Sequence, residues 1–284
     1  MTEVAAVTEA APVGRPFFAD QPPRPPRLNR PLRPTAWGTV RTLLSLVWPL
    51  IAVLAAWACW VRLAGIPPAV APDPVQVLAY LSGNLTSLLG DAWHTMTVVI
   101  GGLVLGTVAG GLIAGLSWFS DVLRGLISGP ALLTQCLPVA TITPVLARIF
   151  GYSQTTMVLI AAIIAFFPVM VFTATGLRAT PSGSDDLFVV LGAGRWQQFW
   201  RLAVPAALPR LLVALAVSVV AAVAGAMLAQ WVMGTEGLGS RLVVAQSSFR
   251  TAEAWACSVV AIVISVFLYG VVSAVSRRVA ERFA

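Results

Sequence analysis

Residues 178–205 read RATPSGSDDLFVVLGAGRWQQFWRLAVP, and this stretch is the most informative part of the sequence about the fold of the chain. Ser184 is a suitable helix N-cap, and Asp185 and Asp186 place negative charge in the first turn, where the helix dipole favours it. Five consecutive apolar residues complete a short helix, which Gly192 is expected to end in a left-handed conformation. A second, amphipathic helix then leads toward the next apolar segment. An exposed apolar helix indicates either a docking surface or a helix lying in the membrane interface.

The chain on both sides of this stretch is too apolar for a soluble globule. Of its 284 residues, 58% are hydrophobic and 10% are charged, against about 45–50% and about 25% in soluble domains. Six stretches without a charged residue are long enough to cross a bilayer, which takes about 20 helical residues. They lie near 42–61, 95–118, 125–147, 153–176, 211–233 and 255–276. We therefore expect an all-α membrane protein with six transmembrane helices.

Small residues in one of these spans predict close packing, and prolines in another predict a kink or break. The span near 95–118 has glycines at four-residue spacing, which predicts a close helix crossing. These are Gly102, Gly106 and Gly110, flanked by Gly101, Gly111 and Gly115. The span near 125–147 is expected to be kinked or broken by its prolines. These are Pro130, Pro138 and Pro144.

The basic residues indicate orientation rather than a nucleic-acid partner. All 18 are Arg, and they are spread along the chain, which has a formal net charge of +7. With the N-terminus inside, 14 Arg fall on inner segments and four on outer ones, as the positive-inside rule requires. Both termini are therefore expected to be cytoplasmic. Residues 1–36 are rich in Pro and Arg, which predicts a disordered cytoplasmic tail before a transmembrane domain at 37–284.

The composition also excludes several kinds of chemistry. The chain has no Lys, which a P-loop ATPase and a Schiff-base enzyme both need. With one His and three Cys, a His/Cys metal site is not expected, and no nucleophile–base set indicates a catalytic residue. A secondary transporter or channel is one class of protein that such a chain suits. Such proteins usually carry ionisable residues inside their spans, and the six expected spans contain none.

Polar side chains within the apolar segments are candidates for lining a solute path. They are Thr134, Gln135, Thr141 and Gln230. A Thr in a helix often bonds back to its own helix carbonyl instead. An amide in lipid needs a partner, which makes the two Gln the stronger candidates. Neutral groups of this kind suit a neutral or zwitterionic solute.

The stretch at 178–205 resembles the EAA motif of permease subunits of bacterial ABC importers, which reads E-A-A, three residues, G, nine residues, then I-x-L-P. Gly192 takes the Gly position, and Leu202, Val204 and Pro205 fall on I, L and P in register. Asp186, Leu187 and Phe188 fall on E-A-A, with a shorter acid and bulkier apolar groups. Other segments resemble the nitrate/sulfonate/taurine subfamily. These are PPAVAPDPVQVLAYL, LPVATITPVLARIFG, AFFPVMVFTATGLR and GTEGLGSRL.

The resemblance implies a type I ABC importer permease in the bacterial cytoplasmic (inner) membrane. Two copies would form the path, and an external binding protein would deliver a small solute, such as a sulfonate, taurine, nitrate or a heterocyclic vitamin precursor. Each copy would dock one ATP-binding subunit, so that two of them hold ATP and Mg and this chain needs no cofactor. The residues implied in ATPase coupling are Asp185, Asp186, Leu187, Phe188, Gly192, Arg195 and Pro205.

Overall fold

The structure is a computed structural model that describes residues 36–126, 129, 138–180 and 183–283, and these residues are helical or in loops, with no strand among them. The chain divides into two units, Met1–Val53 and Leu54–Ala284. Helix α1 (Ala36–Leu63) crosses the boundary between the units. All contacts discussed below lie within the second unit.

The second unit is built from long apolar helices joined by short ones. The long helices are α3 (Leu85–Phe119), α6 (Gln154–Leu177), α9 (Val204–Met233) and α11 (Thr251–Phe283). The short helices are α2 (Pro74–Gly83), α5 (Val139–Phe150), α7 (Ser184–Val190), α8 (Arg195–Gln198), the π-helical segment η1 (Phe199–Ala203) and α10 (Leu238–Ser247).

Four helical segments are long and apolar enough to cross a membrane. They are Leu85–Phe119, Gln154–Leu177, Arg195–Met233 and Thr251–Val279. Four of the six expected spans are thus confirmed as helices of spanning length. The segments Ile51–Leu63 and Val139–Phe150 are shorter apolar helices, so a six-span topology stays a prediction.

The glycine pattern of α3 marks a close crossing with α6. A Cβ atom on Gly106 would lie 2.7 Å from the carbonyl oxygen of Ala162, and one on Gly110 would lie 2.8 Å from that of Phe166. A Cβ on Gly102 would overlap Ala161 in the same way. Because the backbones of α3 and α6 approach this closely only where Cβ atoms are missing, the predicted close crossing is confirmed.

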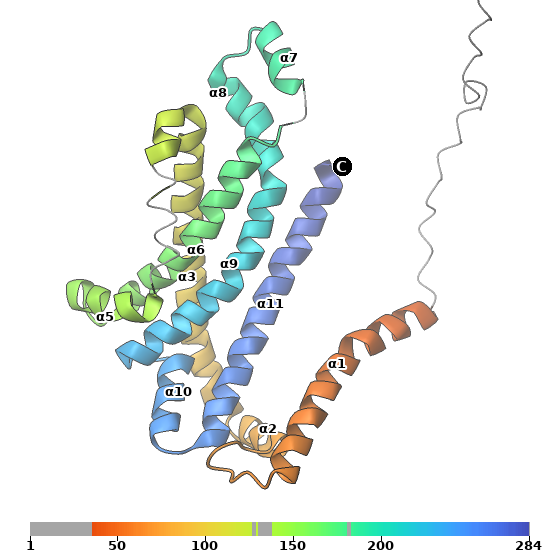
Figure 1. The fold of residues 1–284 in the computed structure, drawn as a ribbon, viewed down its shortest axis with the longest axis vertical. Coiled ribbons are helices and arrows are strands. Elements are labelled where there is room, and N and C mark those ends of the chain that lie inside the picture. The colour runs from red at the N-terminus through yellow and green to blue at the C-terminus, as the bar shows by residue number, and fades with distance from the viewer. Residues whose placement is uncertain (1–35, 127–128, 130–137, 181–182, 284) are drawn as a thin grey trace, which may run out of the picture. The chain divides into compact units, whose positions relative to one another are not determined.

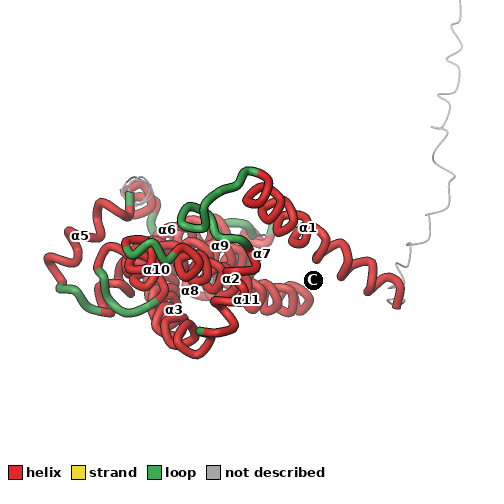
Figure 2. The backbone as a smooth tube through the Cα atoms, turned by 90° about the horizontal axis from the view of Figure 1, so that it is seen from below, coloured by secondary structure: helices red, strands yellow, loops and turns green. Residues whose placement is uncertain are grey.

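The segment expected near 125–147 is interrupted at a proline. Pro138 is the N-cap of α5 and has an extended backbone, so the helix begins only at Val139. The expected break is confirmed at this position, and most of the preceding residues lie outside the described part of the chain. Helix α5 runs across the direction of the long helices and reaches out to one side of them (Figures 1 and 2).

The long helices separate two ends of the second unit. Helices α7 and α8 lie at one end, while α2 and α10 lie at the other (Figure 1). The C-terminal end of α11 points toward the end that carries α7. Since α9 has 30 residues, at about 1.5 Å per residue it places about 45 Å between the two ends.

Candidate functional site

Helix α7 forms as expected, but its N-terminus differs from the prediction. Gly183 is the N-cap, with a left-handed φ of 82°, and Ser184 is already the first helical residue. No side-chain hydrogen bond caps the helix. The prediction of a Ser184 cap was therefore wrong. Glycine tolerates the left-handed backbone that starts the helix one residue earlier.

Gly192 ends α7 in the predicted left-handed conformation, with φ 70°. The N–H of Ala193 donates to the carbonyl of Phe188 at 2.9 Å, and the N–H of Gly192 donates to that of Val189 at 3.0 Å. These two bonds form a Schellman motif, which satisfies the carbonyls at the helix end. The prediction of a glycine-terminated short helix is confirmed.

The apolar residues of α7 are presented to the outside rather than packed on the bundle. The exposed fractions are 56% for Leu187, 67% for Val189 and 84% for Val190. Asp186 is exposed and Phe188 is partly buried, while the side chain of Asp185 lies outside the described part of the structure. An apolar surface of this kind on a seven-residue helix requires either a partner or a lipid interface.

The helix after Gly192 is continuous with the following span, which the sequence did not predict. α8, η1 and α9 form one helical rod from Arg195 to Met233, instead of a separate amphipathic helix followed by a span. Pro205 is the second residue of α9 and directly follows the π-helical segment. The Val204 N–H reaches back to the Phe199 carbonyl, a π-type bond that lets the rod continue. The rod begins at Arg195, directly after the turn that ends α7.

A cluster of aromatic side chains fastens this rod to the end of α3. It consists of Trp118, Phe119, Trp196, Phe199 and Trp200. The ring centroids of Phe119 and Phe199 are 4.9 Å apart, and those of Trp118 and Phe199 are 5.3 Å apart. The Arg195 guanidinium lies 5.6 Å from the Trp118 ring centroid and donates to the Trp118 carbonyl at 3.4 Å. Arg195 thus holds the last turn of α3 by a cation–π contact and a helix C-cap.

Two further Arg side chains cap helix ends on this side of the unit. Arg178 donates to the Ser117 carbonyl of α3 at 3.4 Å, and Arg210 donates to the Thr175 carbonyl of α6 at 2.7 Å. Cations are favourable at helix C-termini because of the helix dipole. The Arg residues that indicated orientation in the sequence therefore also tie α3, α6 and α9 together near α7.

The structure describes two of the four predicted path residues, Thr141 and Gln230. Thr134 and Gln135 lie outside the described residues. Thr141 is exposed on α5, while the neighbouring Thr143 bonds back to the Val139 carbonyl at 2.7 Å, as Thr often does in a helix. Gln230 is fully buried. A role in lining a path stays a prediction for all four candidates.

Gln230 instead holds the beginning of α10 in place. Its Oε1 accepts from Thr95 Oγ1 at 3.0 Å and from the Gly239 N–H at 3.1 Å, and the Leu238 N–H donates to Thr95 Oγ1 at 3.0 Å. A Cβ on Gly237 would overlap the Gln230 amide, and one on Gly239 would overlap the α9 backbone. Gly237 and Gly239 of the GTEGLGSRL segment are therefore needed for this close approach.

A partly buried ion cluster that the sequence did not predict lies at the same end. Arg241 donates to Glu253 and Asp91, at 2.8 Å each, and to Tyr80 Oη at 3.1 Å. Arg250 pairs with the other oxygen of Glu253 at 2.6 Å. Burial would lower the pKa of the Arg241 guanidinium, but its hydrogen bonds to Asp91, Tyr80 and Glu253 raise it overall. The cluster joins α2, α3, α10 and α11 with no unpaired charge.

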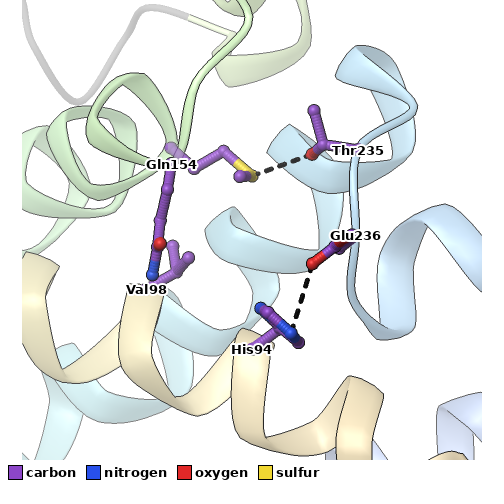
Figure 3. A pocket seen from close by; sticks show the side chains of 6 residues that line it. His94, Val98, Gln154, Thr235 and Glu236 are labelled. Atoms are coloured by element: carbon purple, nitrogen blue, oxygen red, sulfur yellow. Dashed lines mark hydrogen bonds and ion pairs between the residues drawn. The ribbon is translucent and has the colours of Figure 1, made fainter.

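A small cavity of about 190 Å³ opens beside this end, between α3, α6 and the loop from α9 to α10 (Figure 3). His94 Nε2 and Glu236 Oε2 are 3.2 Å apart, and Thr235 Oγ1 donates to Met157 Sδ at 3.3 Å. Gln154 faces the His94–Glu236 pair from the opposite side (Figure 3). Val98 forms part of the floor. The polar rim and apolar floor suit a small polar ligand.

The described chain is a bundle of helices, four of which are long and apolar enough to cross a membrane. No group of three potential metal ligands is present in the parts of the chain that the structure describes. The chain aligns structurally with a chain of the crystal structure of an amino acid ABC transporter, with a TM-score of 0.59 and 18% identity over 70% of this chain and 97% of that one. At this identity the likeness shows a shared fold and no more.

Sequence relatives establish the family. Residues 102–283 match the model of the binding-protein-dependent transport system inner membrane component, and the chain belongs to this family. It is 31% identical to the formylaminopyrimidine transport permease ThiX of Halalkalibacterium halodurans, over 66% of this chain and 75% of that protein. It is 28% identical to the riboflavin permease RibX of Chloroflexus aurantiacus, over 75% and 82%. It is 24% identical to the taurine permease TauC of Escherichia coli, over 82% and 86%.

The family settles the class of function that the sequence left open. The chain is a permease subunit of an ABC importer, which forms the translocation path for a small solute and works with ATPase and binding-protein partners. Subunits of this family are non-catalytic membrane components. The alternative of a secondary transporter or channel is thereby removed.

Proposed function

We propose that α7 is the site where the ATP-binding subunit docks and drives this permease. The observation that carries the proposal is the exposed apolar face of α7, held at a fixed angle by the left-handed Gly192 turn. Leu187 and Phe188 would insert into a groove on the ATPase, and Asp186 would pair at its rim. The interface rests on a few buried apolar anchors, as most protein interfaces do.

Movement of α7 would then act on two spans at once. Arg195 begins the rod that runs through Pro205 into α9, so α9 moves directly. The aromatic cluster and the Arg195 cap connect the same rod to α3. Closure of the ATPase pair, with ATP and Mg held by those subunits, would rock α3 and α9 together between inward-facing and outward-facing arrangements.

The proposed topology has six spans, with both termini and α7 in the bacterial cytoplasm and residues 1–36 as a cytoplasmic tail. Most Arg residues fall on segments expected on the same side of the membrane as α7, which supports this orientation. The C-terminal end of α11 also points toward the end of the unit that carries α7 (Figure 1). Two copies of the chain would form the path, with one ATPase on each. The opposite end, with α2 and α10, would receive the solute from the extracytoplasmic binding protein.

The solute is proposed to be a small molecule of the range named for the relatives, which includes a formylated aminopyrimidine, riboflavin and taurine. Thr134, Gln135, Thr141 and Gln230 remain candidates for contacting it along the path. Gln230 would reach it only if the Gly237–Gly239 segment moved away, because its amide is enclosed in the described arrangement.

A substitution at the Gly192 turn tests the docking proposal. Gly192→Val places a β-branched residue at a left-handed φ, which is strongly disfavoured, and so changes the angle of α7 without touching a span. Gly194→Val is the matched control, because Gly194 is also exposed but has a φ of −68°. In proteoliposomes with both partners, Gly192→Val should abolish ATP-driven uptake while the protein still inserts, and Gly194→Val should retain it. Normal uptake by Gly192→Val would refute the proposal.

A further inference from the structure

The turn between α10 and α11 has a phenylalanine in a backbone conformation that favours glycine. Phe249 has a left-handed φ of 55°, and the other residues of the described chain with a positive φ are all glycines. A left-handed backbone brings the Cβ of an L residue close to the following carbonyl oxygen, which glycine avoids. A bulky residue at such an angle is a conformational outlier. The shape of the turn alone would therefore favour glycine at this position.

The hydrogen bonds of this turn are those of a glycine-terminated helix. The N–H of Arg250 donates to the Ala245 carbonyl at 2.8 Å, and the N–H of Phe249 donates to the Gln246 carbonyl at 3.1 Å. These bonds form a Schellman motif, in which the left-handed position after the helix is most often glycine. Gly192 takes the same position after α7, with the equivalent pair of bonds. The two turns differ in the phenyl ring, which is the feature that needs an explanation.

The phenyl ring contributes little to the packing of the chain that carries it. Phe249 is 78% exposed, and no ring contact joins it to another residue of the described chain. Single exposed apolar residues are common on protein surfaces, but this one also occupies an unfavourable backbone conformation. A phenyl ring has no polar group for water, and its burial is favourable. Both the backbone and the exposure of Phe249 are therefore accounted for if the ring is buried against a partner.

The residues around Phe249 in the sequence are polar and exposed. Residues 246–248, which read Gln-Ser-Ser, are all exposed. The side chain of Arg250 is 53% exposed and pairs with Glu253 through one nitrogen, and its remaining N–H groups have no partner in the described chain. An aromatic ring beside an Arg within a polar rim is the composition of a protein–protein hot spot. A membrane interface is met instead by Trp and Tyr or by a continuous apolar helix face, so these neighbours favour a protein partner.

The loop before α2 lies beside this turn. Thr251 Oγ1 donates to the Pro68 carbonyl at 2.6 Å, which holds the loop against the beginning of α11. Val70 in the same loop is 70% exposed. The loop and the turn both lie at the end of the second unit opposite α7 (Figure 1). Two neighbouring connections therefore each present an exposed apolar side chain at this end.

We propose that Phe249 is the anchor on which the extracytoplasmic binding protein docks. The ring enters an apolar pocket of that protein, and Arg250 pairs with a carboxylate at the rim of the pocket. The partner surface is thus an apolar pocket with an acidic rim. The left-handed turn keeps the ring pointing out of the chain before the partner arrives, which lowers the entropy lost on binding. This inference rests on the proposed function, which places the binding protein at this end, and adds the residue and the chemistry of the contact.

The test compares Phe249→Gly with Phe249→Tyr in the assembled transporter in lipid nanodiscs. Glycine suits the left-handed turn, so Phe249→Gly should unfold at the same temperature as the unsubstituted chain or about 2–4 °C higher. Loss of the ring should nevertheless raise the Kd of the importer's own binding protein at least about tenfold. Phe249→Tyr keeps the ring and should bind within about threefold of the unsubstituted chain. A merely structural role of Phe249 would instead lower the unfolding temperature of Phe249→Gly.

A benzophenone amino acid in place of Phe249 identifies what the ring touches. Irradiation should join it to the binding protein, and the mass of the product distinguishes this from capture of a lipid or of a second permease copy. Capture of either of these alone would overturn the proposal, and so would an unchanged Kd in Phe249→Gly. That unchanged Kd would overturn the anchor alone. No binding of the binding protein to the unsubstituted transporter, with the ATPase still attached, would overturn the proposed function of this end as well.

Discussion

Replacement of Gly106 by Ala probes the crossing of α3 and α6, on which the rest of the second unit is built. The added Cβ would lie 2.9 Å from Ala165 Cβ and 2.7 Å from the Ala162 carbonyl oxygen. Carbon atoms prefer roughly 3.5 Å or more, so the helices must separate by roughly 0.6 Å. Overpacking of this kind costs about 1–3 kcal/mol, and the widened gap forfeits dispersion along the interface. Helix propensity returns up to about 1 kcal/mol.

The expected result is a net loss of about 1–2 kcal/mol in unfolding free energy. Gly111→Ala on the same helix is the matched control, because a Cβ there meets nothing within 4 Å, and it should be neutral or stabilising by up to about 1 kcal/mol. The assay is reversible unfolding in mixed detergent and SDS micelles, followed by tryptophan fluorescence. Equal stability of Gly106→Ala and Gly111→Ala would refute the close-crossing argument.

Two further perturbations test the contacts at either end of the unit. Arg195→Ala should lower the solute carried per ATP hydrolysed by about fivefold while the ATPase still binds, because a cation–π contact and a helix cap are lost. Arg201→Ala is the control, because Arg201 is an exposed Arg with no described partner, and it should leave this ratio unchanged. Equal behaviour of the two variants would count against a role of the Arg195 contacts in coupling. Glu253→Gln should destabilise the protein by about 3 kcal/mol, because it removes one of the two carboxylates that pair with Arg241. Asp73→Asn, at the exposed Arg62–Asp73 pair, is the control and should change the unfolding free energy little. Since the pKa of Arg241 is raised above its ordinary value, its contribution is fully present below the unfolded-state pKa and lost only as pH rises through the folded one. The loss in Glu253→Gln should therefore be the same at neutral and mildly alkaline pH, and a marked alkaline dependence of thermal unfolding would contradict this.

Local sequence signals were enough to predict α7, its glycine turn and the close packing of α3. Each depends on residues within a few positions of one another, such as Gly192 after an apolar run or glycines one helical turn apart. The break at Pro138 followed from the missing N–H of proline in the same way. The α7 cap was predicted wrongly because two neighbouring residues, Gly183 and Ser184, can both start a helix. In the structure Gly183, with a left-handed backbone, is the N-cap.

Contacts between residues far apart in the chain could not be predicted from the sequence. Gln230 was singled out as a path candidate because an amide in an apolar span needs a partner, and the structure supplies one from Thr95, 135 residues away. Arg241 was counted only as an outer charge, although Asp91 lies 150 residues before it in the sequence and binds it. Acidic residues close to span ends, such as Asp91 and Glu253, were the available signal for this cluster.

The most direct test of the central claim is to ask which end of the chain touches the ATPase. A photoreactive benzophenone amino acid at Val190 on α7, which is 84% exposed, is compared with one at Val70 in the loop before α2, which is 70% exposed. In the assembled transporter, irradiation should join the ATP-binding subunit to the permease labelled at Val190 and not to the one labelled at Val70. Capture of the ATPase from Val70, or none from Val190 in an importer that is active, would contradict the account.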